Sequence, residues 1–267
     1  MREQEVARET SEIEERLNRA VELFLTPRPS PVTPRDEDLL RQGMGLALSC
    51  GLAATAWGVG PTVLLAHGWE SRGTHWGAFV SPLVGAGFRA VAVDAPAHGD
   101  SPGERTNVLE FGRALIRVGR EIGPLAGIVA HSFGAGATAI ALHGGLAARR
   151  VALIAGPASL ASVIERWGRR YGLTERDIPT FVRLVEREVG EPIEGLDVAR
   201  IASGLTTPAL IVHDRGDREI PVEDGLSVAA AWPGAKALIT ERYGHRRILI
   251  AGEVVRETVE FLGAQDG

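Results

Sequence analysis

The chain has 267 residues, of which 45% are hydrophobic and 24% charged, a balance typical of a globular protein and compatible with one large domain. The formal net charge of −5 argues against a nucleic-acid-binding protein, which would usually be basic. Cys50 is alone, which excludes an intrachain disulfide and a Cys-rich metal site. The first residues show no apolar signal segment and no apolar run is long enough to cross a bilayer, so we expect a cytoplasmic protein with no membrane partner.

The first 42 residues form an arm that contains no glycine. Apolar residues at helical spacing predict an amphipathic helix over residues 3–25, and four prolines between positions 27 and 34 predict an extended linker. Thr33-Pro34 followed by Asp36 is typical of a helix start, so a short helix to about Arg41 is expected. We expect the arm, residues 1–42, to pack on the main domain. A role in dimerisation, giving a homo-oligomer, or at a membrane surface is the alternative.

From residue 43 onward, short apolar runs alternate with helical patterns. Strands are predicted at residues 52–57, 62–67, 88–94, 125–131, 151–155, 209–213 and 237–240. Helices are predicted at residues 76–84, 106–121, 133–146 and 245–262. The strands are continuous apolar runs, which is typical of parallel strands covered on both faces. The predicted fold class is therefore α/β, with a mostly parallel central sheet and helices on both faces, built from residues 43–156 and 208–267.

One stretch, residues 157–207, interrupts this alternation with three helical patterns, at residues 160–170, 175–189 and about 195–202. A helical insertion between two strands of the sheet is interpreted as a lid. Its aromatic residues Trp167, Tyr171 and Phe181 are candidates for lining a substrate pocket. The equally strong alternative is that they hold the lid to the body of the protein.

The clearest chemical signal is the sequence Ala130-His131-Ser132-Phe133-Gly134, which lies between a predicted strand and a predicted helix. A GxSxG-type nucleophile elbow needs small residues beside the serine, because strand and helix pack closely at this strained turn. Ala130 replaces the first glycine and is still small. We therefore predict that Ser132 is an exposed nucleophile above the sheet edge.

A serine hydroxyl needs a base within hydrogen-bond reach, and the base needs an acid to orient it. His245 follows the last predicted strand, so it lies at the same sheet edge as Ser132. The segment after the strand at 209–213 supplies three candidate acids, Asp214, Asp217 and Glu219. The residues alone leave the choice among these acids open.

Five motifs occur in a fixed order along the chain: His67-Gly68-Trp69, Asp94 to Ser101, Ala130 to Gly134, His213 to Pro221, and Gly244-His245. Together they resemble the α/β-hydrolase superfamily, and specifically its serine esterases and lipases, over about residues 45–265. The resemblance implies the α/β-hydrolase fold and selects Asp217 as the acid of a triad with Ser132 and His245. It also places the oxyanion hole at the backbone N–H groups of Trp69 and Phe133, with the Trp69 side chain at the substrate pocket.

A serine nucleophile on this fold predicts acyl transfer, so we expect a carboxylesterase that cleaves small or medium carboxylic esters through an acyl-enzyme on Ser132. The alternatives are a C–C hydrolase, thioesterase or lyase with the same triad, or a small-molecule receptor on a hydrolase scaffold. The sequence contains no nucleotide motif, metal cluster or cofactor-binding motif, so neither cofactor nor metal is expected. The expected partner is a small-molecule ester or related acyl substrate.

Overall fold

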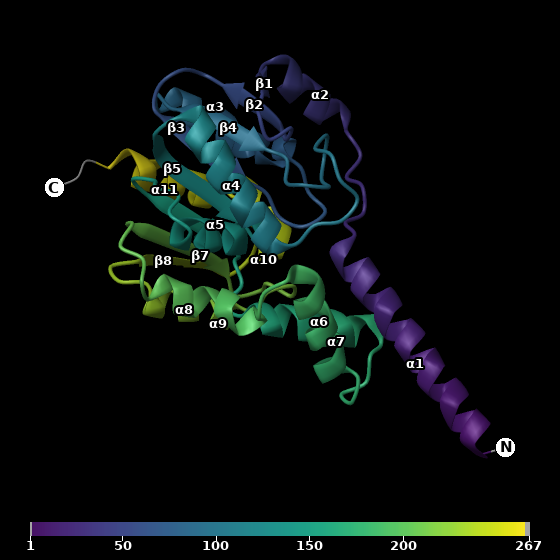
Figure 1. Ribbon diagram of the computed structural model, residues 1–267. Helices are drawn as coiled ribbons and strands as arrows, with labels where there is room; N and C mark the ends of the chain where they lie inside the picture. The colour runs from purple at the N-terminus through teal and green to yellow at the C-terminus, as the bar shows by residue number, and fades with distance from the viewer. Residues whose placement is uncertain (1, 265–267) are drawn as a thin grey trace.

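A twisted sheet of eight strands forms the centre of the molecule, in the order β1-β2-β4-β3-β5-β6-β7-β8 (Figure 1). The structure is a computed structural model that describes residues 2–264, with side chains from residue 11 onward. The strands are β1 (Met44–Ala47), β2 (Ala53–Trp57), β3 (Thr62–Ala66), β4 (Arg89–Val93), β5 (Leu125–His131), β6 (Val151–Ile154), β7 (Ala209–Asp214) and β8 (Lys236–Thr240). Strand β2 runs antiparallel to β1 and β4, and every other neighbouring pair is parallel. The predicted fold class is confirmed.

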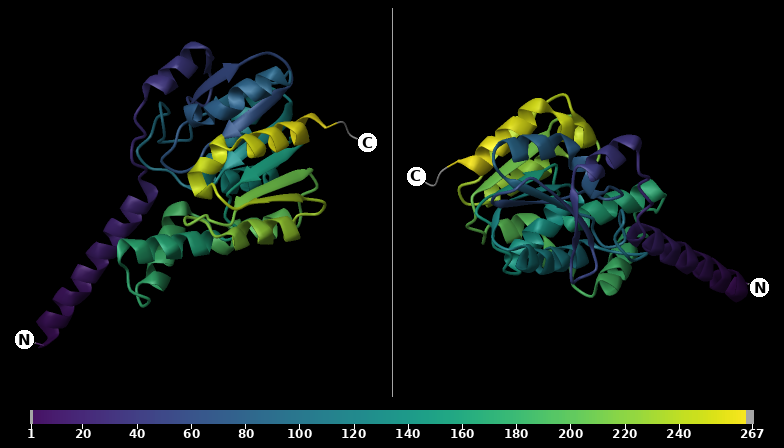
Figure 2. Two further views of the ribbon diagram at one scale, coloured as in Figure 1. Left: turned by 180° about the vertical axis from the view of Figure 1, so that it is seen from behind. Right: turned by 90° about the horizontal axis from the view of Figure 1, so that it is seen from above.

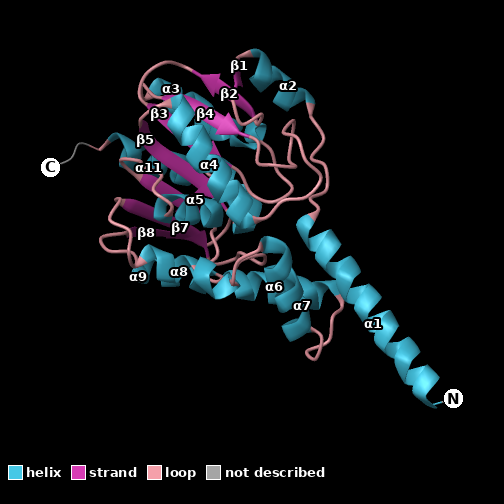
Figure 3. Ribbon diagram, in the orientation of Figure 1, coloured by secondary structure: helices cyan, strands magenta, loops and turns pink. Residues whose placement is uncertain are grey.

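Helices cover both faces of the sheet, because β3, β5 and β7 are buried along their whole length and leave apolar side chains on both sides. On one face lie α3 (Gly77–Gly85) and α11 (Gly252–Gly263), the latter yellow in Figure 2. On the other face lie α4 (Val108–Ile122), α5 (Phe133–His143) and α9 (Val222–Ala231). Figure 3 shows the sheet between these layers.

Most predicted elements occur within a few residues of their predicted bounds, and the exceptions have physical reasons. Strand β1 was not predicted because its side chains are mostly exposed at the sheet edge and carry no apolar pattern. Helix α9 was also not predicted. The single helix predicted at residues 245–262 is wrong: α10 (Gly244–Arg247) and the short 3-10 turn Ile248–Ile250 are separated from α11 by Ala251, whose backbone is extended.

Helical segments fill the long connection between β6 and β7. They are α6 (Leu160–Tyr171), α7 (Ile178–Val189), the 3-10 turn Ile193–Leu196 and α8 (Val198–Ala202). Helices α6 and α7 pack against each other, and α8 packs against α5 and α9. This segment is the one that the sequence analysis interprets as a lid.

The arm that precedes the sheet contains α1 (Arg2–Leu25) and α2 (Pro34–Arg41). Helix α2 starts as its sequence predicts, with Pro34 in the first turn and Thr33 and Asp36 in a reciprocal capping box. The first turns of α1 project away from the body (Figure 1), whereas its C-terminal end packs on α6 and α7. Its buried residues Leu17, Ala20, Val21 and Leu25 belong to the same apolar core as the inner faces of α6 and α7. None of the helices within residues 2–264 is long and apolar enough to cross a membrane.

Candidate active site

Ser132 lies at a sharp turn between β5 and α5, with φ 52° and ψ −115°. This left-handed backbone is strained for any residue with a side chain, and the surrounding structure must hold it in place. The backbone N–H of Ser132 donates to the carbonyl of Ile154 at 2.9 Å. Gly134 lets the helix approach, because a Cβ atom there would lie 2.3 Å from the carbonyl oxygen of Ala66. The turn therefore has the geometry of a nucleophile elbow at the carboxyl edge of the sheet.

The side chains of Ser132, His245 and Asp217 form one hydrogen-bonded chain. His245 Nε2 lies 2.9 Å from Ser132 Oγ, and His245 Nδ1 lies 2.7 Å from Asp217 Oδ2. The other carboxylate oxygen, Asp217 Oδ1, accepts the backbone N–H groups of Glu219 at 2.8 Å and Ile220 at 2.9 Å. Three residues distant in the chain are thus brought into one array. Both carboxylate oxygens of Asp217 accept hydrogen bonds, which fixes the orientation of its side chain.

Electrostatics set the direction of these hydrogen bonds. The Asp217 side chain is fully buried, which alone would raise its pKa, but hydrogen bonds from His213 and His245 hold that pKa well below its usual range. A charged carboxylate only accepts, so the proton of neutral His245 lies on Nδ1. The lone pair on Nε2 then faces Ser132 Oγ, where it can take the hydroxyl proton.

Asp214, the other aspartate after β7, has a different environment. Its Oδ1 accepts from the N–H of Gly216, and its Oδ2 accepts from the Thr240 hydroxyl at 2.6 Å and from the N–H groups of Arg242 and Tyr243 at 3.0 and 2.9 Å. Burial alone would raise the pKa of Asp214, but these hydrogen bonds lower it to about 2. Asp214 therefore remains charged and ties the loop after β7 to the loop that carries His245.

His131, directly before Ser132, contacts α10, the short helix that carries His245. Its Nε2–H donates to the backbone carbonyl of His245 at 2.8 Å, and the two rings lie 4.8 Å apart. Burial and the neighbouring His245 lower the pKa of His131 to about 3, so its ring is neutral near pH 7. Sequence reasoning assigned no role to His131, because its partner lies 114 positions away and no local pattern indicates the contact.

The loop after β3 brings the predicted oxyanion-hole residues together. A Cβ on Gly68 would lie 3.3 Å from Ser132 Cβ, so this loop runs directly against the elbow. The rings of Trp69 and Phe133 meet edge to face at 5.1 Å. Phe133 is the first residue of α5, and the first N–H groups of a helix have no partner within it. Trp69 and Phe133 are thus in contact with each other, on the two segments that meet at the serine.

His67 fixes the shape of this loop. Its Nδ1–H donates to the carbonyl of Gly68 at 2.7 Å, and its Nε2 accepts the N–H of Ala95 at 2.9 Å. Burial, followed by the nearby His98, lowers the pKa of His67 to about 3. The ring is therefore neutral and links the loop after β3 to the loop after β4.

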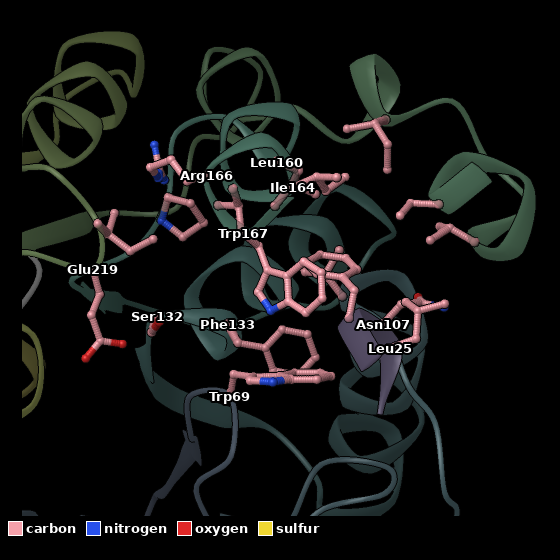
Figure 4. Close-up of a pocket in the computed structure, with 18 of the residues that line it drawn as sticks. Leu25, Trp69, Asn107, Ser132, Phe133, Leu160, Ile164, Arg166, Trp167 and Glu219 are labelled. Carbon is pink, nitrogen blue, oxygen red and sulfur yellow. The ribbon is translucent and has the colours of Figure 1, made fainter. Parts of the chain in front are cut away.

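A cavity of about 200 Å³ opens at Ser132 and extends beneath α6 and α7 (Figure 4). Trp69 and Phe133 form one side of it and Trp167 the opposite side. The remaining apolar lining comes from α1, the start of α4, the segment between β6 and β7, and the loop after β7: Phe24, Leu25, Val108, Pro157, Leu160, Val163, Ile164, Val185, Val189, Ile193 and Ile220. Polar lining residues are His245 and Glu219 at the serine, Arg166 and Arg170 on α6, and Thr106 and Asn107 before α4.

Two of the four aromatic residues predicted to line the pocket lie elsewhere. Trp69 and Trp167 line the cavity, whereas Tyr171 and Phe181 are not among its lining residues. Both stack on the Trp167 ring, with centroids 5.2 and 5.7 Å away, and Phe181 is fully buried. They pack behind Trp167 and support the cavity wall, because they lie on the sides of their helices that face the apolar core.

Comparison with known proteins places this arrangement in a family. Residues 63–258 match the alpha/beta hydrolase family, and the chain belongs to that family. The match covers β3 to α11 and therefore all three residues of the hydrogen-bonded chain at Ser132. It confirms the resemblance drawn from the five motifs. The part of the chain that the structure describes contains no group of three His, Cys, Asp or Glu side chains that could hold a metal ion.

Particular relatives show what this chain is similar to. A stretch of 52 residues is 44% identical to pimeloyl-[acyl-carrier protein] methyl ester esterase from Methylococcus capsulatus, and it spans a fifth of that protein's length. An esterase from Exiguobacterium antarcticum has a TM-score of 0.63 at 17% identity, covering 83% of this chain and all of that one. A bromoperoxidase from Bacillus anthracis has a TM-score of 0.62 at 18% identity, covering 82% and 99%. These two structures are similar in fold.

Proposed function

We propose that this protein is a serine carboxylesterase with Ser132 as nucleophile, His245 as general base and Asp217 as the orienting acid. The observation that carries the proposal is the unbroken chain of hydrogen bonds from Asp217 Oδ2 through His245 to Ser132 Oγ, at 2.7 and 2.9 Å. Its polarity is the one that activates a serine: a buried charged carboxylate, a neutral imidazole, and a hydroxyl on a strained turn.

The proposed reaction has two halves. In the first, His245 Nε2 takes the proton of Ser132 as Oγ attacks the ester carbonyl, and the backbone N–H groups of Trp69 and Phe133 stabilise the negative oxygen. The same proton then goes to the departing alcohol oxygen as the ester C–O bond breaks, which leaves an acyl group on Ser132. In the second half, His245 takes a proton from water, the hydroxide attacks the acyl carbon, and Ser132 leaves with that proton.

The shape of the cavity supports a small or medium apolar acyl group. Its volume of about 200 Å³ is below the usual range for drug-sized ligands, and most of its lining residues are apolar. An acyl chain buried there gains about 0.8 kcal/mol for each methylene removed from water. Two of the similar proteins are named as an esterase and a methyl ester esterase, which supports an ester substrate.

The test is hydrolysis of p-nitrophenyl esters from acetate to decanoate, with labelling of the protein by a fluorophosphonate. We expect turnover and labelling by the natural protein, and loss of both in Ser132→Ala. Ser227→Ala, on the exposed face of α9, is the matched control and should behave like the natural protein. Absence of both labelling and turnover in the folded natural protein would refute the proposal. Turnover of thioesters or C–C substrates in preference to oxygen esters would keep the nucleophile but reassign the bond.

A further inference from the structure

The N-terminal arm forms part of the cavity wall across from the nucleophile, through Phe24 and Leu25. In Figure 4, Ser132 and Glu219 lie at one side of the cavity and Leu25 and Asn107 at the other, with Trp167 between them. An acyl chain attached to Ser132 Oγ and filling the cavity would therefore direct its terminus towards Leu25. Leu25 belongs to α1, which precedes the family match at residues 63–258. Part of the wall at this end of the cavity therefore comes from outside the family match, next to Thr106 and Asn107 from within it.

The position of this wall is fixed by direct contacts with the core. The carbonyl of Leu25 accepts the backbone N–H of Thr106 at 2.9 Å, and Thr106 also lines the cavity. The Phe24 ring meets the Trp167 ring edge to face at 5.3 Å and the Phe181 ring at 5.9 Å. Leu25 is 4% exposed, so its side chain has no room to swing out of the core.

The arm is also held on both sides of this point. Upstream, Arg16 pairs with Asp177, at the start of α7, at 2.7 Å. Downstream, the Arg28 guanidinium donates hydrogen bonds to both carboxylate oxygens of Glu70, at 2.8 and 2.7 Å. Glu70 follows Trp69, one of the proposed oxyanion-hole residues. The arm thus bridges the lid helices and the loop beside the nucleophile, and it behaves as a fixed part of the cavity.

We propose that Phe24 and Leu25 set the acyl-chain length that this enzyme accepts, which makes the N-terminal arm a specificity element of the active site. The inference rests on the proposed esterase function. Because the wall is apolar and fixed, chains that just reach Leu25 gain contact with each added methylene, about fourfold in kcat/KM per methylene. Longer chains meet the wall and lose this gain. The ligand class is therefore an ester with an unbranched apolar acyl group of limited length.

The experiment compares Leu25→Ala and Phe24→Ala with the natural protein over p-nitrophenyl esters from acetate to decanoate. Both variants should move the preferred acyl chain to a longer one and raise the ratio of kcat/KM for long over short esters by about tenfold. Leu25→Phe should move the preference to a shorter chain. Leu23→Ala is the matched control: Leu23 is the neighbouring residue, is 37% exposed and does not line the cavity, so its profile should not change.

Binding of the free acids, from acetate to decanoate, gives a second readout that does not need turnover. Calorimetric affinities in Ser132→Ala, with and without Leu25→Ala, should show the same change in preferred length. Unchanged length profiles in variants that remain folded by thermal melting would overturn the inference, whether or not the natural protein hydrolyses esters. Failure of Ser132 labelling together with a shifted binding profile would instead refute the esterase proposal and leave the arm as the determinant of ligand length.

Discussion

Asp217→Asn is the substitution whose effect follows most directly from the geometry. Oδ1 of Asp217 accepts two backbone N–H groups, those of Glu219 and Ile220. An asparagine has one side-chain oxygen, and these donors hold it at the Oδ1 position. The amide NH₂ then occupies the position of Oδ2, 2.7 Å from His245 Nδ1.

This orientation reverses the polarity of the hydrogen-bonded chain. The NH₂ group donates to Nδ1, so the proton of neutral His245 moves to Nε2, where it faces Ser132 Oγ. The imidazole can no longer take the serine proton. For a serine triad with the acid changed to its amide, the expected loss in kcat is about 10⁴-fold, equivalent to about 5.5 kcal/mol of barrier.

The assay is steady-state hydrolysis of the best p-nitrophenyl ester at about pH 7.5, with circular dichroism to confirm folding. Asp214→Asn is the matched control, since it removes the same charge three positions away. In that variant the donors from Thr240, Arg242 and Tyr243 hold the one side-chain oxygen at the Oδ2 position, so the amide NH₂ faces the N–H of Gly216, which loses its acceptor. The variant should lose about 1–3 kcal/mol of stability while retaining more activity than Asp217→Asn. A folded Asp217→Asn protein with a tenth or more of the natural kcat would refute this reasoning, as would a larger loss of kcat in Asp214→Asn.

Three further outcomes are expected. Gly134→Ala should lower the free energy of unfolding by about 1–3 kcal/mol and reduce labelling of the nucleophile, because its Cβ would lie 2.3 Å from a backbone oxygen, whereas Gly85→Ala, with open space around it, should be neutral in the same urea titration. Phe181→Ala should cost about 3–5 kcal/mol in thermal or urea unfolding, since the ring is fully buried behind the cavity wall, and a loss below about 1 kcal/mol would contradict its supporting role. His67 and His131 bind protons in the unfolded chain below about pH 6.5, but in the folded protein only near pH 3. Their contribution to the free energy of unfolding is therefore fully present above about pH 6.5 and is lost as the pH drops towards 3. Urea titrations between about pH 6.5 and 5 should show an uptake of at least one to two protons on unfolding, and the uptake should be smaller in His131→Gln; a pH-independent midpoint would rule out buried neutral histidines.

Local sequence patterns were sufficient for the parts of the site that depend on the strand edge. Ser132, Asp217 and His245 each follow a strongly apolar strand, and parallel strands bring their carboxyl ends to one edge. That is why a set of residues spread over 113 positions could be named together before their distances were known. The choice of Asp217 over Asp214 needed the family resemblance, because both lie at the carboxyl end of the same strand and their hydrogen bonds, which distinguish them, are not readable from the sequence.

The remaining features depend on packing between distant segments, which a local pattern does not encode. Trp167, Tyr171 and Phe181 carry the same aromatic signal, yet only Trp167 faces the cavity, because the helix rotation is set by the core around it. The amphipathic pattern of residues 3–25 predicts a helix but not that its last turn reaches the cavity. The contact of His131 with the His245 carbonyl likewise follows from the approach of β5 and α10.

The helical segment of residues 157–207, predicted to be a lid, lies between two adjacent parallel strands, β6 and β7, that pair directly from Val151–Ala209 to Ile154–Val212. Because these strands pair directly, exchanging this segment for that of another family member would leave the pairing of the sheet intact. The shared apolar core of α1, α6 and α7 argues against replacing it alone. A foreign lid would meet the exposed apolar stripe of α1, and the native lid would lose its cover if α1 were deleted. Chimeras that aim to change the substrate range should exchange residues 1–42 and 157–207 as one unit.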